Sequence, residues 1–107
     1  MAVISHGTEA DPIFNYGNRT ALDLFEMSWQ EFTALPSRQS AEVPNQAERA
    51  RLLSAVSRWE VIQNYAGVRI SKNGRRFQIE AATVWNLCDH IGHYHGQAAA
   101  FHQWQWL

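Results

Sequence analysis

The chain has 107 residues, which is enough for one compact domain but leaves no room for two. Hydrophobic residues make up 46% of it and aromatic residues 12%, a globular composition that excludes intrinsic disorder. The net charge is −1, so the chain lacks the basic excess of duplex-binding proteins, and we expect no nucleic-acid partner. One cysteine excludes an internal disulfide and fits a reducing compartment, and neither a membrane-spanning run nor a signal peptide is visible. We therefore expect a cytoplasmic location and no membrane partner.

The first quarter of the chain predicts two short strands and a helix. Residues 2–6 resemble a strand, Asp11-Pro12 marks a break, and residues 13–16 form a second short strand. Asn18 is suited to cap a helix over residues 19–27, because its side-chain oxygen can accept a hydrogen bond from an unpaired helical amide.

The middle of the chain predicts two more helices. Ser28 and Glu31 have the capping-box spacing and open a short helix that ends near Leu35-Pro36, because the residue before proline avoids helical angles. A similar cap-like spacing at Asn45 begins the longest predicted helix, which runs over residues 45–58. One apolar stripe on this helix comprises Leu52, Val56 and Trp59.

The C-terminal part predicts three strands. Residues 65–71 form the first, and the Asn-Gly pair within Lys72–Arg75 favours a type I′ hairpin turn. Residues 77–89 form the second strand, Gly92 ends the next turn, and residues 94–104 form the third. Two strands, three helices and three strands in this order indicate an α+β domain whose helices lie on one face of an antiparallel sheet.

Three short motifs resemble the PAS fold. Phe14–Asn18 resembles the Tyr-x-Asn strand end, Ser28–Phe32 the Ser-x-Glu-Glu-Leu helix, and Lys72–Gly74 the Lys-Asp-Gly turn of that fold. The resemblance implies one PAS-like domain over residues 1–107. It would have a five-stranded antiparallel sheet that encloses a small cavity beneath short helices.

A closer resemblance is to the MEKHLA family, a PAS-like group found in bacterial proteins and at the C-terminus of plant class III homeodomain–leucine-zipper transcription factors. It implies sensing, signalling or control of dimerisation, and no catalytic mechanism. The bacterial members usually carry a further N-terminal segment, and the first strand here begins almost at Met1, which suggests a domain cut from a longer protein or an engineered chain. The matching stretches are Ser5–Pro12, Asn15–Asn18, Ala21–Leu24, Gly67–Ser71, Gly74–Phe77, Val84–Leu87 and Gly96–Ala99.

The similarity to flavin-binding PAS domains suggests which strand residues face the cavity, because side chains alternate along a strand. It places Ala81, Leu87 and Ala99 on the cavity side and His93 near the mouth. A slip of one residue would reverse each set. The register of Arg69 on its edge strand stays open. We predict a ligand-binding set of Arg69, Ile79, Thr83, Trp85, His95, Gln97 and Phe101.

The sequence leaves several cofactors open. Residues 35–39 lack the cysteine that light-sensing PAS domains use to bond flavin, so we expect no covalent flavin, while non-covalent binding stays open. His93 and His95 share one face of a strand at a spacing that can bind zinc or copper, with His90 or His102 as a third ligand. Haem ligation by one of these histidines is a further alternative.

An enzyme is the main alternative to a sensor, and we expect it less. The chain has no nucleophile motif, paired carboxylates or phosphate-binding glycine loop. A metal-binding protein or an engineered enzyme on a PAS-like scaffold would use His93 or His95, with Gln97 and Arg69 nearby.

The outer face of the sheet predicts an interface between two copies of the chain. Alternation places Val84 there too, and an uncovered apolar strip of this kind is typical of an interface. We therefore expect a homodimer. The alternative is that the last two tryptophans fold back on their own sheet. The predicted interface residues are Tyr94, Ala98, Ala100, Trp104 and Trp106.

Overall fold

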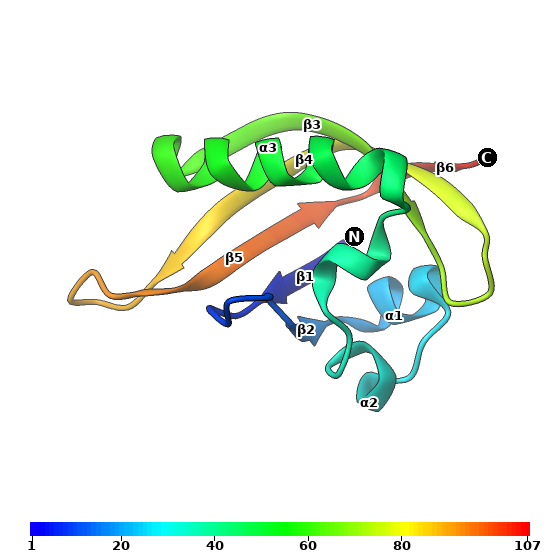
Figure 1. Ribbon diagram of the computed structural model, residues 1–107, viewed down its shortest axis with the longest axis horizontal. Coiled ribbons are helices and arrows are strands. Elements are labelled where there is room, and N and C mark those ends of the chain that lie inside the picture. The colour runs from blue at the N-terminus through cyan, green and yellow to red at the C-terminus, as the bar shows by residue number, and fades with distance from the viewer.

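The computed structural model describes residues 1–107, except the side chains of residues 43 and 44. Six strands form one antiparallel sheet in the order β2–β1–β5–β4–β3, and β6 also pairs with β4 (Figure 1). The elements are β1 (Ala2–His6), β2 (Phe14–Gly17), α1 (Arg19–Phe25), α2 (Trp29–Phe32), the 3-10 helix η1 (Ser37–Ser40), α3 (Val43–Trp59), β3 (Val61–Ile70), β4 (Arg76–Cys88), β5 (Tyr94–Phe101) and β6 (Gln103–Trp106).

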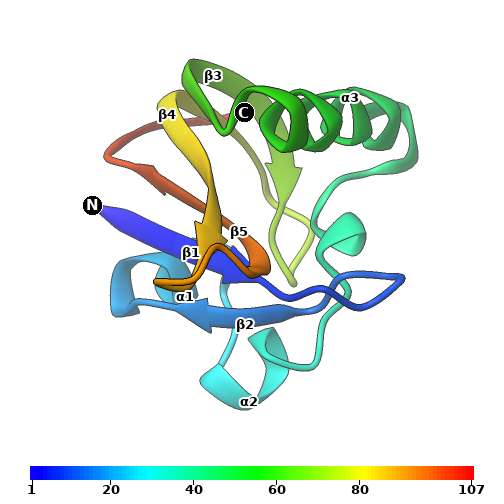
Figure 2. The same cartoon turned by 90° about the vertical axis from the view of Figure 1, so that its left-hand side faces the viewer.

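The helices pack against one face of this sheet, as the sequence predicted. α3 lies along β3 and β4, while α1 and α2 lie against β1 and β2 (Figures 1 and 2). Stacked and tilted phenylalanine rings fill the space between them, among them the pair Phe14–Phe32 with ring centroids 4.2 Å apart. The α+β class is therefore confirmed. No helix in the described part of the chain is long and apolar enough to cross a membrane.

Two of the three predicted helix caps are present. The Asn18 side chain accepts a hydrogen bond from the Ala21 amide at 3.0 Å, and Ser28 and Glu31 form the complete capping box. The predicted cap at Asn45 is wrong, because α3 begins earlier and its N-cap is Glu42, whose side chain makes no capping bond. The predicted stripe on this helix also ends early, since Trp59 is exposed.

The first hairpin of the C-terminal part is where the sequence placed it, but its turn differs. Gly74 has φ +82° and its amide bonds to the Ser71 carbonyl at 3.0 Å, whereas Asn73 is not left-handed. A type I′ turn needs positive φ at both central residues. The type I′ prediction is therefore wrong, and Gly74 alone supplies the left-handed position.

β4 carries a bulge that changes which side chains face the helices. Ala81 has φ +50°, and the register between β3 and β4 shifts beside it, between Tyr65 and Gly67. On the other edge of β4, the predicted strand over residues 94–104 breaks at His102 into β5 and β6. β5 pairs with residues 83–88 of β4, and β6 pairs with residues 77–80, so the sheet has six strands and not five.

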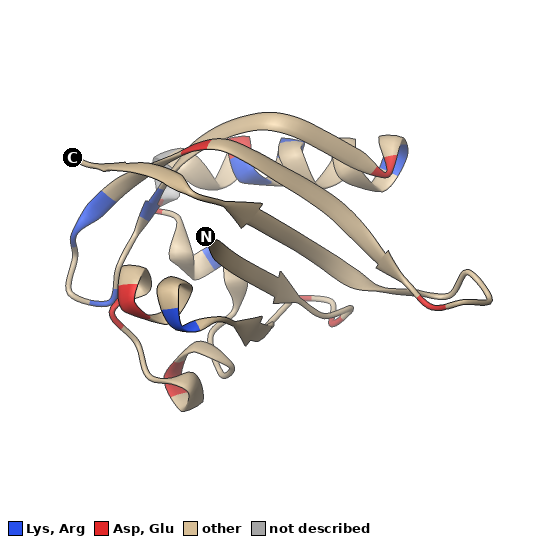
Figure 3. Cartoon of the chain, turned by 180° about the vertical axis from the view of Figure 1, so that it is seen from behind, with Lys and Arg blue, Asp and Glu red and all other residues tan. Residues whose placement is uncertain are grey.

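The outer face of the sheet is poor in charge. β1 and β5 contain no Lys, Arg, Asp or Glu, and Figure 3 shows the charged positions on the helices, the turns and the neighbouring strands. On this face Ala100 of β5 pairs with Val3 of β1 and Thr83 of β4, and Trp85 of β4 pairs with Ala98 of β5. The part of the outer face that β1 and β5 form therefore carries no charged side chain.

Candidate functional site: a cavity under the sheet

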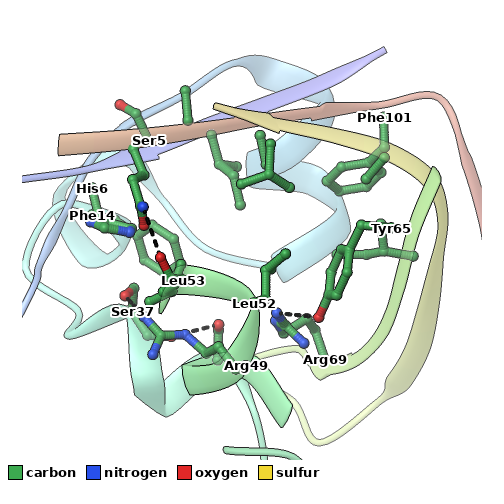
Figure 4. Close-up of a pocket in the computed structure, with 18 residues that line it drawn as sticks. Ser5, His6, Phe14, Ser37, Arg49, Leu52, Leu53, Tyr65, Arg69 and Phe101 are labelled. Atoms are coloured by element: carbon green, nitrogen blue, oxygen red, sulfur yellow. Dashed lines mark hydrogen bonds between the residues drawn. The ribbon is translucent and has the colours of Figure 1, made fainter. Parts of the chain in front are cut away.

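A cavity of about 60 Å³ lies between the inner face of the sheet, α3 and η1 (Figure 4). Its apolar wall includes Ile4, Phe14, Leu52, Ile79, Val84 and Phe101. Its polar wall includes His6, Ser37, Arg49, Tyr65, Arg69 and Gln97. Figure 4 shows His6, Ser37 and Arg49 gathered on one side, with Tyr65 and Arg69 on the other. An apolar pocket with a few convergent polar groups is the form of a small-molecule site.

Arg49 brings a buried positive charge to the cavity from the first half of α3. It shares a helix face with Leu52 and Val56, three and seven residues later, which both pack in the core. Its Nη2 donates to Ser37 Oγ on η1. Burial lowers the pKa of Arg49 to about 10, and the nearby charge of Arg69 acts in the same direction.

Arg69 brings a second buried charge from β3. Its Nη1 donates to the Val68 carbonyl at 2.9 Å, and its Nη2 donates to the Tyr65 hydroxyl at 3.0 Å. The Tyr65 hydroxyl in turn donates to Glu48 Oε2 at 2.8 Å, and burial raises the pKa of Tyr65. Arg69 is therefore linked to a carboxylate only through the tyrosine between them.

His6 faces the same cavity from β1. Its Nδ1 lies 3.0 Å from the Gly7 carbonyl, so Nδ1 is the protonated nitrogen of the neutral ring and donates this bond. Its buried Nε2 has no hydrogen-bond partner among the described residues. Burial lowers the pKa of His6, although the Gly7 carbonyl acts in the opposite direction. The ring is thus a neutral group with a free acceptor position.

Glycine at position 96 allows β5 to approach β1 at His6. Gly96 has φ +130°, and a Cβ atom there would lie 1.9 Å from the His6 carbonyl oxygen. Any other residue would push the two strands apart. The close approach also places Gln97 beside His6, where its Nε2 donates to the Leu53 carbonyl at 3.2 Å and to Asn86 Oδ1 at 3.1 Å.

Comparison with known proteins identifies the family. The sequence matches the MEKHLA domain over residues 1–106, which is almost the whole chain. The chain belongs to the MEKHLA family. No curated protein matches it significantly.

Solved structures agree with a PAS-like fold for this MEKHLA domain. The PAS domain of a Colwellia psychrerythraea protein matches with a TM-score of 0.72 at 17% identity, over 92% of this chain and 80% of that one. The LOV domain of the blue-light photoreceptor Aureochrome1 matches with 0.75 at 12% identity, over 95% and 74%. The light-state dimer of the fungal blue-light photoreceptor Vivid matches with 0.71 at 21% identity, over 92% and 74%. At these identities the likeness establishes the fold alone.

The cavity of the MEKHLA domain does not fit a flavin or a haem. Sites for drug-sized ligands occupy roughly 300–1,000 Å³, several times the volume of about 60 Å³ found here. The single cysteine, Cys88, is exposed at the end of β4 and does not line the cavity. This cavity, as the described residues form it, is therefore too small for either group.

Four of the seven predicted ligand-binding residues line the cavity: Arg69, Ile79, Gln97 and Phe101. Ala99 lines it too, as its strand parity predicted. Thr83 and Trp85 do not, and neither do Ala81 and Leu87, because the bulge at Ala81 reverses the alternation of β4. Ala82 and Val84 take their place, so the predicted cavity face of β4 beyond Ile79, and the predicted outward position of Val84, are wrong.

His93 and His95 lie outside the cavity, on the β4–β5 hairpin. Both side chains are mostly exposed and turn to one carboxylate: His95 Nε2 lies 3.0 Å from Asp89 Oδ2, and His93 Nδ1 lies 3.6 Å from it. The prediction that His95 faces the cavity and His93 its mouth is wrong, because the hairpin extends beyond the helical layer (Figure 1). Within the described residues, no three His, Cys, Asp or Glu residues are arranged to hold a metal ion.

The predicted interface residues fall into two groups. Tyr94 is exposed, Ala100 is half-buried on the outer face, and Ala98 is buried between β1 and β4. Trp104 and Trp106 of β6 pair with Ile79 and Phe77 of β4. Both tryptophans therefore lie on the helical side of the sheet, and their predicted outer position is wrong. They fold back on their own chain. The Arg75 guanidinium carbon also lies over the Trp106 ring, 3.8 Å from the centroid of that ring.

Sequence reasoning missed several residues of the polar wall, among them His6, Ser37, Arg49 and Tyr65. Arg49 has the same helical spacing as Leu52 and Val56, and that spacing could have revealed an inward-facing charge. His6 alternates with Ala2 and Ile4, which marks the inner face of β1. Ser37 gave no signal, because a 3-10 helix after proline has no distinctive sequence pattern.

Proposed function

We propose that this MEKHLA domain is a sensory domain that binds a small molecule in the cavity under its sheet. The observation that carries the proposal is the cavity itself, in which two guanidinium groups and an imidazole converge opposite an apolar wall. Buried polar groups of this kind are costly unless they have partners. A ligand that supplied those partners would give the domain two states, bound and free, that it could report.

Two alanines that are neighbours in β5 provide the test. Ala99 lines the cavity, whereas Ala100 lies on the outer face of the sheet. Ligand-observed NMR with a library of small metabolites, in a buffer free of carboxylates, should detect binding to the unaltered protein. Ala99→Leu should fill the cavity and abolish that binding, and Ala100→Leu should leave it unchanged.

Binding that survives Ala99→Leu, or no binding from the whole library, would contradict the proposal. Melting temperatures establish that each variant is folded. Should Ala99→Leu unfold the domain, Ala82→Val adds a smaller group to the same cavity and replaces it.

We further propose that the domain forms a homodimer through the outer face of its sheet. The absence of charged residues from β1 and β5 supports this face as the contact, and the similar Vivid protein is described as a light-state dimer. The proposed surface comprises Val3, Trp85, Tyr94 and Ala100. A reducing compartment, and hence the cytoplasm, suits the exposed and unpaired Cys88.

The alternative, a metalloprotein or enzyme that uses His93 and His95, has weaker support. Those side chains contact Asp89 on an exposed hairpin, while Gln97 and Arg69 line the cavity. The four residues therefore do not form one site.

A further inference from the structure

Two buried positive charges border the cavity without a carboxylate in direct contact. Arg49 and Arg69 are 8% and 7% exposed, and neither forms an ion pair with any described residue. Glu48 reaches Arg69 only through the Tyr65 hydroxyl. Buried charges are normally paired, because an unpaired one loses its hydration without compensation. The cavity is therefore suited to an anion.

The side of the cavity around Arg49 offers a matched set of donors and one acceptor. Arg49 has five N–H donors but makes one side-chain hydrogen bond in the described structure, to Ser37 Oγ. Ser37 accepts that bond and keeps its own O–H for another acceptor. His6 Nε2 is buried and unpartnered, and with Nδ1 protonated it is a hydrogen-bond acceptor. Donors suit a carboxylate, and the acceptor suits a hydroxyl.

The volume sets the size of this ligand. A water-sized group needs about 10–15 Å³ of such space, so about 60 Å³ holds a molecule of roughly four to six non-hydrogen atoms. The identity of this ligand rests on the proposed ligand-binding function and names the chemical class of the molecule bound. We propose that the cavity binds a small hydroxy carboxylate, whose carboxylate pairs with Arg49 and Ser37 and whose hydroxyl donates to His6 Nε2.

Glycolate is the probe of this proposal, and glycolamide is its uncharged counterpart of the same shape. Titration of the unaltered protein, followed by amide shifts in ¹H–¹⁵N NMR spectra, should show glycolate binding at least about tenfold more tightly than glycolamide, because charge-assisted hydrogen bonds are lost in the amide. Acetate, which lacks the hydroxyl, should bind more weakly than glycolate. Equal binding of glycolate and glycolamide, or tighter binding of inorganic phosphate than of glycolate, would overturn the proposal.

Arg49→Met tests the residue that carries the charge. It should weaken glycolate binding at least about tenfold and raise the melting temperature, because an unpaired buried charge is replaced by an apolar chain of similar length. A purely structural arginine would instead lower the melting temperature when removed. Arg51→Met, two residues away on the exposed side of α3, is the matched control and should change neither measurement.

The outcomes separate this inference from the proposed function. A neutral metabolite that binds and is blocked by Ala99→Leu, while glycolate does not bind, would refute the carboxylate and leave the sensory function standing. No binding of any probe would refute both. If Arg49→Met lost glycolate binding and also had a lower melting temperature, that result would count against an unpaired charge at Arg49. His6→Asn then decides whether the ligand hydroxyl is bound as proposed, because this variant should lose the preference for glycolate over acetate.

Discussion

His6 is held in the core as a neutral imidazole, and that state depends on pH. Burial lowers its pKa below the ordinary value, and the charge of Arg49 on α3 acts in the same direction. The Gly7 carbonyl, Gln97 on β5 and Glu9 in the following loop oppose the shift. The unfolded chain therefore binds a proton more readily than the folded domain. The contribution of neutral His6 to the free energy of unfolding is therefore complete above about pH 6.5, the pKa of histidine in the unfolded chain. It is lost as the pH falls below that value.

We predict that His6→Asn reduces this loss of stability in acid. Asparagine can keep a hydrogen bond to the Gly7 carbonyl but takes up no proton. The free energy of unfolding by urea, measured at pH 7.5 and pH 5, should fall less in this variant than in the unaltered protein. His90→Asn, on the exposed hairpin, is the control and should keep the full difference. An unchanged difference in His6→Asn would mean that His6 is not the group responsible.

Among the elements, β4 shows most clearly how one backbone position sets a binding face. Ala81 adopts a left-handed conformation in the middle of a strand, which costs an alanine about 1–2 kcal/mol. This bulge turns Ala82 and Val84 toward the cavity, and on the other edge of β4 the pairing strand changes from β6 to β5 at the same place. The strained residue is therefore part of the cavity's construction.

We predict that Ala81→Val destabilises the domain by more than about 1 kcal/mol, because a β-branched side chain tolerates positive φ poorly. In an ordinary exposed strand position the same change would be neutral or favourable. Thr83→Val, two residues later and away from the cavity, is the matched control and should change stability by less than about 0.5 kcal/mol. Urea unfolding measures both, and a stable Ala81→Val would show that the bulge is absent or readily moved.

The bulge also explains which parts of the molecule the sequence could predict. Local signals were sufficient for the Asn18 cap, the Ser28 capping box and the position of the Gly74 hairpin, because each depends on residues close together in the chain. On β5, simple alternation correctly predicted that Gln97, Ala99 and Phe101 face the cavity, but it failed at His95. Alternation did not predict the cavity face of β4, because an alanine at position 81 gives no sequence signal of a left-handed conformation.

For the cavity, the sequence predicted Arg69 and Gln97 as ligand-binding residues but missed Arg49 and His6. These two missed residues lie on elements whose apolar periodicity was visible, at positions where an inward polar group conflicts with the expected core. Such conflicts between pattern and residue type mark functional sites more often than errors of folding. The contact between Arg49 and Ser37 could only come from the fold.

At the scale of the whole molecule, β5 separates two proposed surfaces. Ala99 faces the cavity, and Ala100 faces outward on the part of the sheet where β1 and β5 carry no charged residues. A ligand that shifted β5 would therefore act directly on the outer surface. This arrangement gives a short physical path by which binding could change association between two copies.

We predict that Ala100→Lys converts the proposed dimer to a monomer, because a charge at the centre of the proposed apolar contact would be buried without a partner. Light scattering during size-exclusion chromatography should give about 25 kDa for the unaltered protein, twice the 12.3 kDa chain, and the monomer mass for the variant. Ser54→Lys, exposed on α3 on the opposite side of the sheet, should remain a dimer. A monomer in the unaltered protein at high concentration would contradict the proposed contact.

The most direct test of the account is to map where a bound molecule acts on the domain. ¹H–¹⁵N NMR spectra, recorded while glycolate or a library hit is added, should show the largest amide shifts at His6, Ser37, Arg49 and Gln97, which line the cavity. They should show little change at His93 and His95 on the hairpin. Shifts confined to that hairpin or to the outer face, or none at all, would contradict the cavity as the ligand site.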